Sequence, residues 1–300
     1  FKGNKSFQFN CADCDAIRID GEERIPEPRR RNNTIRTSGI FRKIEKIKIQ
    51  FPVGEEDPTR SQLYLAPAVG WNNYDKWMFG GVVHNLTLIE KRFEYMLVPM
   101  YASGSKGLSG GGRLSYHLYF NNSLLNKMTV TVGYSRYSYE HFQTYIDTTK
   151  QNFSADLHYQ KISSSVTLSL LDRKKNPDEF SFITLRHVYI EYERPQFTLL
   201  NQPTDSISIY HVGLRKFYPN FYFLSYQFGN LITFHPREFN LTLGHTLNLV
   251  LASIEYDQTI SFNTKGRGFE YRIFAGFNGE LEDLKYTSAG IFDARYHING

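Results

Sequence analysis

The segment Phe239–Leu251, FNLTLGHTLNLVL, alternates apolar and polar residues along most of its length. A period of two is that of a β-strand whose two faces are unlike. In a soluble sheet the apolar face packs into a core, whereas in a membrane barrel it meets lipid and the polar face lines the interior. The local pattern is the same in both cases, so the rest of the chain must discriminate between them.

Similar segments of about 9 to 16 residues follow one another from Gln62 onward, separated by turn-forming clusters, and no helical period longer than two turns interrupts them. Some neighbouring segments can form one long strand with a bend, so about a dozen strands are expected. We predict strands at 62–72, 77–85, 92–105, 108–121, 127–140, 152–161, 163–173, 180–194, 205–218, 221–232, 238–253, 255–264 and 267–278.

The length of these segments favours a membrane barrel over a soluble β-sandwich or a large lipocalin-like barrel. Tilted strands need about 9–11 residues to cross a bilayer, whereas soluble strands usually have about 5–6. Aromatic residues such as Trp71, Tyr74 and Trp77 stand near expected strand ends, where the interfacial girdles of membrane barrels lie. In the opening segment we expect lipid-facing Leu241, Leu243, Leu247 and Leu249, and inward-facing Asn240, Thr242 and Asn248.

Other classes of protein are disfavoured by composition. No run approaches the roughly 18 apolar residues of a membrane helix, which excludes a helical membrane protein. The net charge is +5, but the basic residues are scattered and form no recognisable nucleic-acid-binding module. We therefore expect no nucleic-acid partner, and a mild attraction to anionic lipid headgroups explains the charge more simply.

The first sixty residues differ from the rest. Short polar strands or hairpin arms are expected at the start, with Asp20-Gly21 as a turn signal. The segment RIPEPRRRNNTIRTSG has prolines, adjacent charges and no period, which is typical of a linker. IFRKIEKIKIQF fits either an amphipathic helix or an edge strand. We expect the triplet Arg29–Arg31 to lie outside the hydrocarbon zone, because unpaired backbone cannot face lipid.

Two cysteines, Cys11 and Cys14, form a lone C-x-x-C pair. Such a pair can be a redox couple, half of a zinc site or a local disulfide. There is no second pair, and the nearest histidine is His84. A disulfide or two idle thiols in an oxidising compartment is therefore favoured over zinc. Asp13 and Asp15 complete the only closely spaced set of metal-ligand residue types, and we predict no metal site and no cofactor in this chain.

Three further features are similar to parts of catalytic or binding motifs, but none of them is a complete motif. The tail RYHING, Arg295–Gly300, is similar to the Tyr-His-x-Ser-Asn-Gly signature of outer-membrane phospholipase A, but Ile298 directly precedes Asn299 and no serine nucleophile is present. The glycine-rich Ser103–Leu114 places Lys106 before the glycines, so a tight hairpin is predicted rather than a phosphate loop. The histidines show no HExxH or HxH spacing, and His245 stands alone on an apolar face.

The carboxylates Glu191 and Glu193 share a strand face and are expected to pair with Arg186 or Arg194 in a packing role. Taken with the preceding features, this leaves no catalytic, cofactor-binding or metal-binding residue to predict. The chain contains no catalytic motif, and we predict that it has no catalytic activity as given, while the sequence leaves undecided whether the full-length protein is an enzyme.

A family resemblance is carried by three patches. They are the Asn-Asn-x-Ile-Arg segment (Asn32–Arg36), the Gly-Trp-Asn-x-Tyr-x-x-Trp-Met turn (Gly70–Met78) and the Phe-Glu-Tyr-x-x-x-Pro-Met-Tyr strand (Phe93–Tyr101), with KGRGFEYRIFAGF (Lys265–Phe277) similar to a later strand. The chain thereby resembles the C-terminal region of large M1-type (gluzincin) metallopeptidases of Bacteroidota, in which a zinc peptidase domain precedes an outer-membrane β-barrel. The HExxH zinc motif of that family is absent here, so no catalytic residue is carried over, and the resemblance implies zinc only for a full-length protein that includes the peptidase domain.

Together these observations predict an all-β protein, an antiparallel transmembrane β-barrel of about 12 or more strands preceded by a short non-membrane β/linker segment. Residues 1–60 would be a periplasmic or surface segment and linker, and 61–300 the barrel. Bacterial barrels usually finish on an aromatic-terminated strand, whereas this chain ends in HING, so the barrel is expected to be incomplete at its C-terminal end.

The expected location is the bacterial outer membrane, with the bilayer, lipopolysaccharide and other outer-membrane proteins as partners. The expected role is that of a membrane anchor or structural or assembly partner, attached to an M1-like peptidase domain outside this chain. The alternatives are an outer-membrane channel or transport barrel, and part of a metallopeptidase whose active site lies elsewhere.

Overall fold

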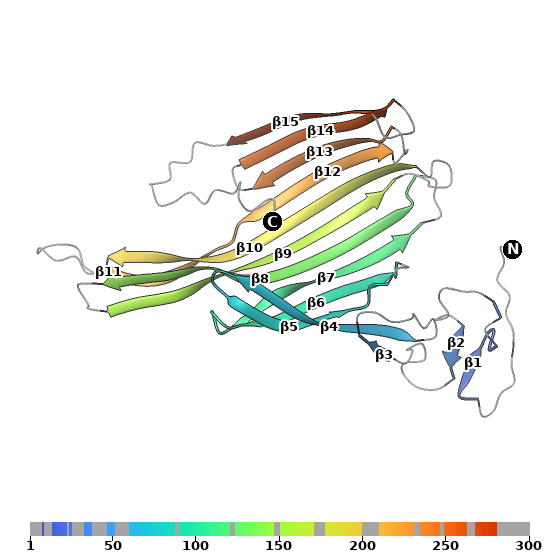
Figure 1. The fold of residues 1–300 in the computed structure, drawn as a ribbon, viewed down its shortest axis with the longest axis horizontal. Helices are drawn as coiled ribbons and strands as arrows, with labels where there is room; N and C mark the ends of the chain where they lie inside the picture. The colour runs from blue at the N-terminus through green and yellow to red at the C-terminus, as the bar shows by residue number, and fades with distance from the viewer. Residues whose placement is uncertain are drawn as a thin grey trace, which may run out of the picture. The chain divides into compact units, whose positions relative to one another are not determined.

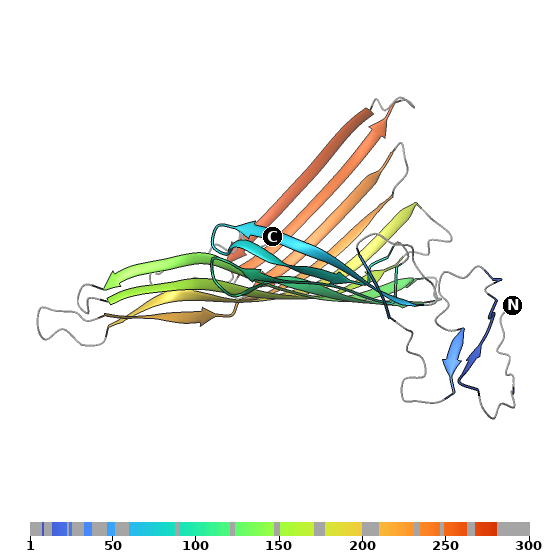
Figure 2. The same cartoon turned by 60° about the horizontal axis from the view of Figure 1, so that its bottom comes forward.

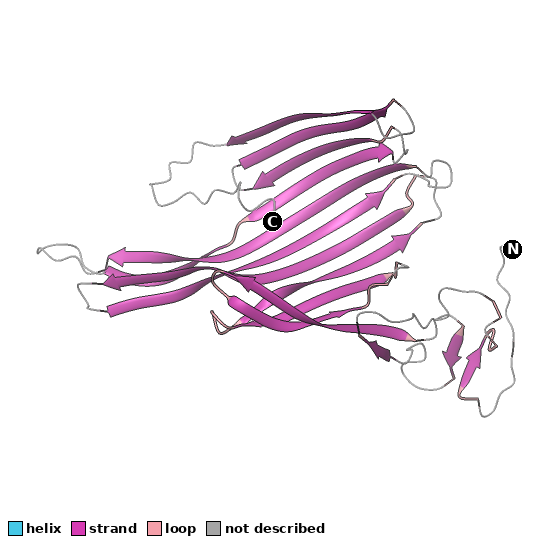
Figure 3. Cartoon of the chain, viewed as in Figure 1, coloured by secondary structure: helices cyan, strands magenta, loops and turns pink. Residues whose placement is uncertain are grey.

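The computed structural model is all-β (Figure 3). It describes residues 8, 14–22, 24–25, 33–37, 47–51, 60–87, 90–120, 124–146, 151–170, 178–199, 210–230, 235–246, 249–262 and 268–280. Among these residues, no helix is long and apolar enough to cross a membrane.

Fifteen strands are described. Three short ones come first, namely β1 (Ala16–Arg18), β2 (Thr34–Arg36) and β3 (Ile47–Gln50). The longer strands are β4 (Ser61–Asn72), β5 (Lys76–His84), β6 (Phe93–Ala102), β7 (Leu108–Tyr119), β8 (Lys127–Ile146), β9 (Gln151–Ser169), β10 (Glu179–Leu199), β11 (Tyr210–Phe217), β12 (Asn220–Asn230), β13 (Arg237–Thr246), β14 (Leu249–Ser261) and β15 (Gly268–Glu280).

The strand pairing is that of a meander. The hydrogen-bonded order is β15-β14-β13-β12-β10-β9-β8-β7-β6-β5-β4-β3, with β11 also on β10. Strands β4 to β7 pair antiparallel, as do β10 with β12 and β12 to β15, whereas β3 pairs with Ser61–Tyr64 of β4 in parallel. The all-β, mostly antiparallel architecture agrees with the sequence prediction. Within the described residues the sheet does not close into a barrel, because β3 and β15 stand at the two ends of this order and do not pair with each other.

The chain divides into two compact units. The first comprises Phe1–His117, Val132–Gln160 and Pro195–Leu214, and the second comprises Leu118–Thr131, Lys161–Arg194 and Arg215–Gly300. In the first unit, β4 to β7 form successive hairpins (Figure 1). In the second unit, β12 to β15 lie side by side in sequence order, and Figure 2 shows the same arrangement from another direction.

The predicted strands 62–72, 77–85, 92–105 and 108–121 agree with β4 to β7 to within three residues, whereas β8 continues six residues beyond the predicted 127–140. The strand boundaries were predicted wrongly at two places farther along the chain. The predicted 152–161 and 163–173 are the single strand β9, and the predicted 238–253 ends at Thr246, after which β14 begins at Leu249. The alternation of Leu247, Asn248 and Leu249 continues through this turn, so periodicity alone could not reveal it.

The N-terminal segment contains more strand than the linker interpretation allowed. Thr34–Arg36, inside the expected linker, pairs with Ala16–Arg18 in a two-stranded antiparallel sheet. Asp20 has a positive φ of 53°, and its carboxylate accepts the backbone N–H groups of Arg24 and Ile25. The edge-strand interpretation holds for Ile47–Gln50, while Arg29–Arg31 lie outside the described residues.

Candidate functional site: an apolar sheet face and a buried carboxylate

One face of β4–β7 is apolar from Leu65 in β4 to Tyr116 in β7. The strand registers place on this face cross-strand rows such as Val69, Phe79, Tyr101 and Leu108. Its members are Leu65, Pro67, Val69, Trp71, Trp77, Phe79, Gly81, Val83, Phe93, Tyr95, Leu97, Pro99, Tyr101, Leu108, Gly110, Gly112, Leu114 and Tyr116. None of them is Asp, Glu, Lys, Arg or His. We call this set the apolar face of the first unit.

Aromatic rings border this face at both ends. Trp71 pairs with Trp77 beside the β4–β5 turn, and Phe93 pairs with Tyr116 at the opposite end. The rings are well exposed, Trp71 by 58% and Tyr116 by 44% of their surface. Between Phe93 and Tyr101 the strand covers about 26 Å, which a tilt of about 40° reduces to about 20 Å. This approaches the roughly 25 Å apolar band of membrane barrels, flanked by aromatic girdles.

The opposite face of the same strands is small, buried or polar. Met78, Met100 and Ala102 form its buried apolar cluster, against which Ala68 and Val98 pack. Toward the other end the buried imidazole of His117 lies between two carboxylates, 3.2 Å from Glu90 and 3.4 Å from Glu94. Charged groups therefore occupy one face of this sheet and are absent from the other.

The second unit repeats this division. The face containing Leu185, Leu224 and Leu243 carries a central apolar region, completed by Ile183, Tyr226, Phe228, Phe239, Leu241, Ala252, Ile254, Tyr256, Ile273, Ala275 and Phe277. The leucines are exposed, Leu185 by 56% and Leu243 by 45%.

The face opposite the central apolar region carries several side-chain hydrogen bonds and ion pairs. Glu238 accepts a hydrogen bond from Gln227 and one from Asn240, each at 2.8 Å. Arg272 lies 2.5 Å from Glu255. A sheet with one face polar and paired and the other apolar and exposed fits an environment that is apolar on one side only.

The face assignments predicted from the opening segment hold in part. Leu241 and Leu243 lie on the apolar face and Asn240 and Thr242 on the opposite one. The assignment of Leu249 was wrong. It pairs with Thr246 and so shares the polar face, because the turn after β13 resets the alternation. Leu247 and Asn248 lie outside the described residues.

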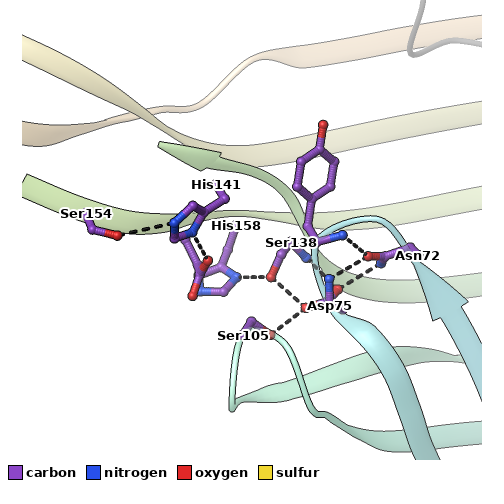
Figure 4. A network of polar contacts seen from close by, with 9 residues as sticks. Asn72, Asp75, Ser105, Ser138, His141, Ser154 and His158 are labelled. Carbon is purple, nitrogen blue, oxygen red and sulfur yellow. Dashed lines mark hydrogen bonds and ion pairs between the residues drawn. The ribbon is translucent and has the colours of Figure 1, made fainter. Parts of the chain in front are cut away.

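Asp75 is the hub of the most buried polar network in the first unit (Figure 4). Its side chain has no exposed surface and comes from the turn between β4 and β5. Oδ1 accepts the hydroxyls of Ser105 at 2.5 Å and Ser138 at 2.6 Å, while Oδ2 accepts the amide of Asn72 and the backbone N–H of Ser138, each at 2.9 Å. All four acceptor positions of the carboxylate are thus occupied.

These contacts fasten two turns to one strand. The Asn72 side chain accepts the N–H groups of Tyr74 and Asp75, which shapes the first turn. Gly104 of the next turn donates its N–H to the Asp75 carbonyl. A Cβ at Gly104 would lie 2.4 Å from the Tyr74 carbonyl oxygen, so only glycine permits this approach. Ser138 then connects both turns to β8.

The direction of the hydrogen bonds shows that Ser138 is not an activated nucleophile. A carboxylate only accepts, so the Ser138 hydroxyl proton points at Asp75. His158 Nδ1, 2.9 Å from Ser138 Oγ, therefore acts as the donor. Burial raises the pKa of Asp75, but the hydrogen bonds from Ser105, Ser138 and Asn72 outweigh it, and the net pKa lies below its ordinary 3.8. The network stabilises the fold around a permanent charge.

Other residues singled out from the sequence have structural surroundings or fall outside the described residues. Cys14 is disulfide-bonded, and Cys11 is the only other cysteine in the sequence, so the disulfide alternative holds. Glu191 pairs with Lys216 at 2.7 Å rather than with either expected arginine. Arg186 instead lies over the Phe223 ring, and Arg194 over Tyr192 and Phe217.

The glycine-rich segment forms the β6–β7 turn and the start of β7, where Lys106 has a φ of 52°. His245 lies on the apolar side of β13, directly opposite Tyr222. The RYHING tail lies outside the described residues. Within the described part of the chain, no group of three or more His, Cys, Asp or Glu side chains is placed to hold a metal ion.

A scan against models of known protein families found no match, and searches of curated proteins and of solved structures found none either.

Proposed function

We propose that this chain is the membrane-spanning β-barrel region of a bacterial outer-membrane protein and serves as a membrane anchor. The observation that carries the proposal is the apolar face of the first unit, free of ionisable groups apart from tyrosine and bordered by aromatic residues at both ends. Leaving its large side chains in water is unfavourable, at about 25 cal/mol per Å² of apolar surface. Lipid covers such a face without a second protein layer.

The disulfide of Cys14 supports this location. Disulfides persist in oxidising compartments, among which are the periplasm and the cell surface. The expected partners are therefore the bilayer and, on the outer leaflet, lipopolysaccharide.

We further propose that the barrel anchors an M1-like peptidase domain encoded outside this chain. The support is the resemblance of Gly70–Met78 and Phe93–Tyr101 to the corresponding region of that family. Gly70–Met78 contains Asp75, the hub of the buried network. The full-length gene tests this directly, since it should encode HExxH and a downstream glutamate ahead of residue 1.

The test of membrane insertion uses the two tryptophans. Trp71 and Trp77 are the only tryptophans in the sequence, and both lie at the same end of the apolar face. In vesicles of brominated phosphatidylcholine, bromines near the headgroups should quench their fluorescence more than bromines near the bilayer centre.

The matched control is quenching by aqueous iodide, which should be weak once vesicles are present. A soluble sheet would show the reverse, with strong iodide quenching and no dependence on bromine position. That result would overturn the anchor proposal.

A further inference from the structure

A serine, a histidine and an aspartate meet on the hairpin of β8 and β9 in the first unit. Figure 4 labels the histidine, His141, and the serine, Ser154. His141 Nδ1 lies 2.7 Å from Asp156 Oδ1, and His141 Nε2 lies 3.3 Å from Ser154 Oγ. The two β9 residues are two positions apart, so they project from the same side of the strand toward His141.

Hydrogen-bond chemistry fixes the roles of the three groups. Because the Asp156 carboxylate only accepts, His141 Nδ1 carries the proton between them. In the neutral imidazole Nε2 is then an acceptor, and the Ser154 hydroxyl donates to it. This is the order nucleophile, base and orienting carboxylate of acyl-transfer sites. It is the reverse of the Ser138 arrangement, in which the serine proton points at the carboxylate.

The group is open to solvent. The His141 side chain is 51% exposed and that of Asp156 31%, and Ser154 is also exposed. Strand alternation places Gln143 beside His141 and Asn152 beside Ser154 on this face. Both are exposed amides. Side-chain amides of this kind stabilise the oxyanion that forms when a hydroxyl attacks a carbonyl.

Aromatic contacts support the hairpin beneath this group. Phe142 and Phe153, which follow His141 and precede Ser154, have ring centroids 6.2 Å apart, and Phe142 also lies 6.3 Å from Phe197 of β10. These residues alternate with the polar ones along their strands, so they occupy the opposite face. The hairpin thus has a packed apolar side that holds the polar side in register.

We propose that Ser154 is a nucleophile for acyl transfer, with His141 as its general base and Asp156 as the positioning residue, and that the site accepts accessible esters with small acyl groups. This activity goes beyond the anchor function and does not depend on it. The site suits a small acyl group, because side chains as exposed as His141 and Asp156 can bury little of a bound ester.

The reaction balances with water as the co-reactant. Ser154 Oγ forms a bond to the ester carbonyl carbon while His141 Nε2 takes the hydroxyl proton. The ester C–O bond then breaks, and the leaving alcohol takes that proton from His141. Water next attacks the acyl-serine and gives a proton to His141, which returns it to Ser154 as the acid departs. The net change is ester plus water to acid plus alcohol.

The experiment uses the purified chain in detergent micelles. A fluorophosphonate probe should label the protein once, at Ser154 by peptide mass spectrometry, and the protein should hydrolyse p-nitrophenyl acetate. Ser154→Ala should abolish labelling. Ser103→Ala, which changes an exposed turn serine, should leave labelling and hydrolysis unchanged.

Two further variants separate catalysis from folding. His141→Gln should lower kcat by at least about 10²-fold, the scale of losing a general base. Asp156→Asn should lower kcat with KM nearly unchanged and should shift the pH profile, whereas a purely structural role would move neither in a folded variant. Far-ultraviolet circular dichroism reports folding. Absence of labelling and turnover in the folded wild type, or equal activity in Ser154→Ala, overturns the proposal.

Discussion

The side chain of Asp75 accepts both the backbone N–H and the hydroxyl of Ser138, a residue 63 positions later in the chain. One side chain thereby holds two atoms of a distant strand, and its remaining acceptor positions hold Asn72 and Ser105. The stability of this part of the first unit should therefore depend strongly on a single carboxylate.

Replacing this carboxylate tests that dependence. Asp75→Asn keeps the shape but turns one acceptor oxygen into an N–H donor group that faces other donors. We expect a loss of about 3 kcal/mol, since each buried donor left unpaired costs about 1–3 kcal/mol. Urea unfolding of the vesicle-reconstituted protein measures it. Asp15→Asn, at an exposed position, is the control and should lie within about 0.5 kcal/mol of wild type.

The pH dependence of stability follows from the lowered pKa of Asp75. A group whose pKa is lower in the folded state contributes stability above its unfolded pKa, and this contribution is lost as the pH falls through the folded value. Wild type and Asp75→Asn should therefore differ fully at pH 7 and converge below the ordinary value of 3.8. Urea midpoints between pH 7 and pH 2 measure this. A constant difference throughout that range would contradict the assignment.

Arginine substitutions discriminate between lipid and water at the apolar face of the second unit. Leu243→Arg should cost about 2–4 kcal/mol if the residue faces the bilayer midplane. Thr242→Arg, its neighbour on the polar face, should cost clearly less. Both variants are compared by urea unfolding in vesicles. In water an exposed leucine tolerates arginine, so two small and equal effects would argue against a lipid-facing surface.

Gly110 should not tolerate a side chain. Its φ is +115°, and a Cβ there would lie 2.0 Å from the Val98 carbonyl oxygen. Gly110→Ala should cost at least about 1–3 kcal/mol through backbone strain and loss of β6–β7 pairing. Gly107→Ala is the matched change, because its Cβ would come no closer than 3.7 Å to any atom. Equal unfolding midpoints for the two variants would refute this explanation.

Sequence periodicity was enough to predict strands of the first unit and the faces of Leu241 and Leu243, because a period of two reports which side of a strand a residue occupies. It failed at Leu249, where a short turn keeps the alternation but exchanges the faces. Period analysis measures spacing within a strand and contains no information on where a strand reverses.

The two groups of hydrogen-bonded polar side chains in the first unit could not be predicted from the spacing of residues in the sequence. His141 lies 13 residues from Ser154 and 15 from Asp156, a separation that matches no short motif. Strand register brings them together, as it brings Asp75 to Ser138. Of these arrangements, the sequence predicted only the turn that carries Asp75, from the aromatic-rich Gly70–Met78 segment.

The parallel strand β3 has a consequence for assembly. It occupies the edge of β4 only along Ser61–Tyr64, and in the described part of the chain nothing pairs with Leu65–Asn72 on that side. An open edge of this kind is a template for another strand. Any strand that joins the sheet there, from this chain or from another, must end its pairing beside Tyr64, where β3 already occupies the edge. The position of this short strand therefore sets the length of β4 over which a closing strand can pair.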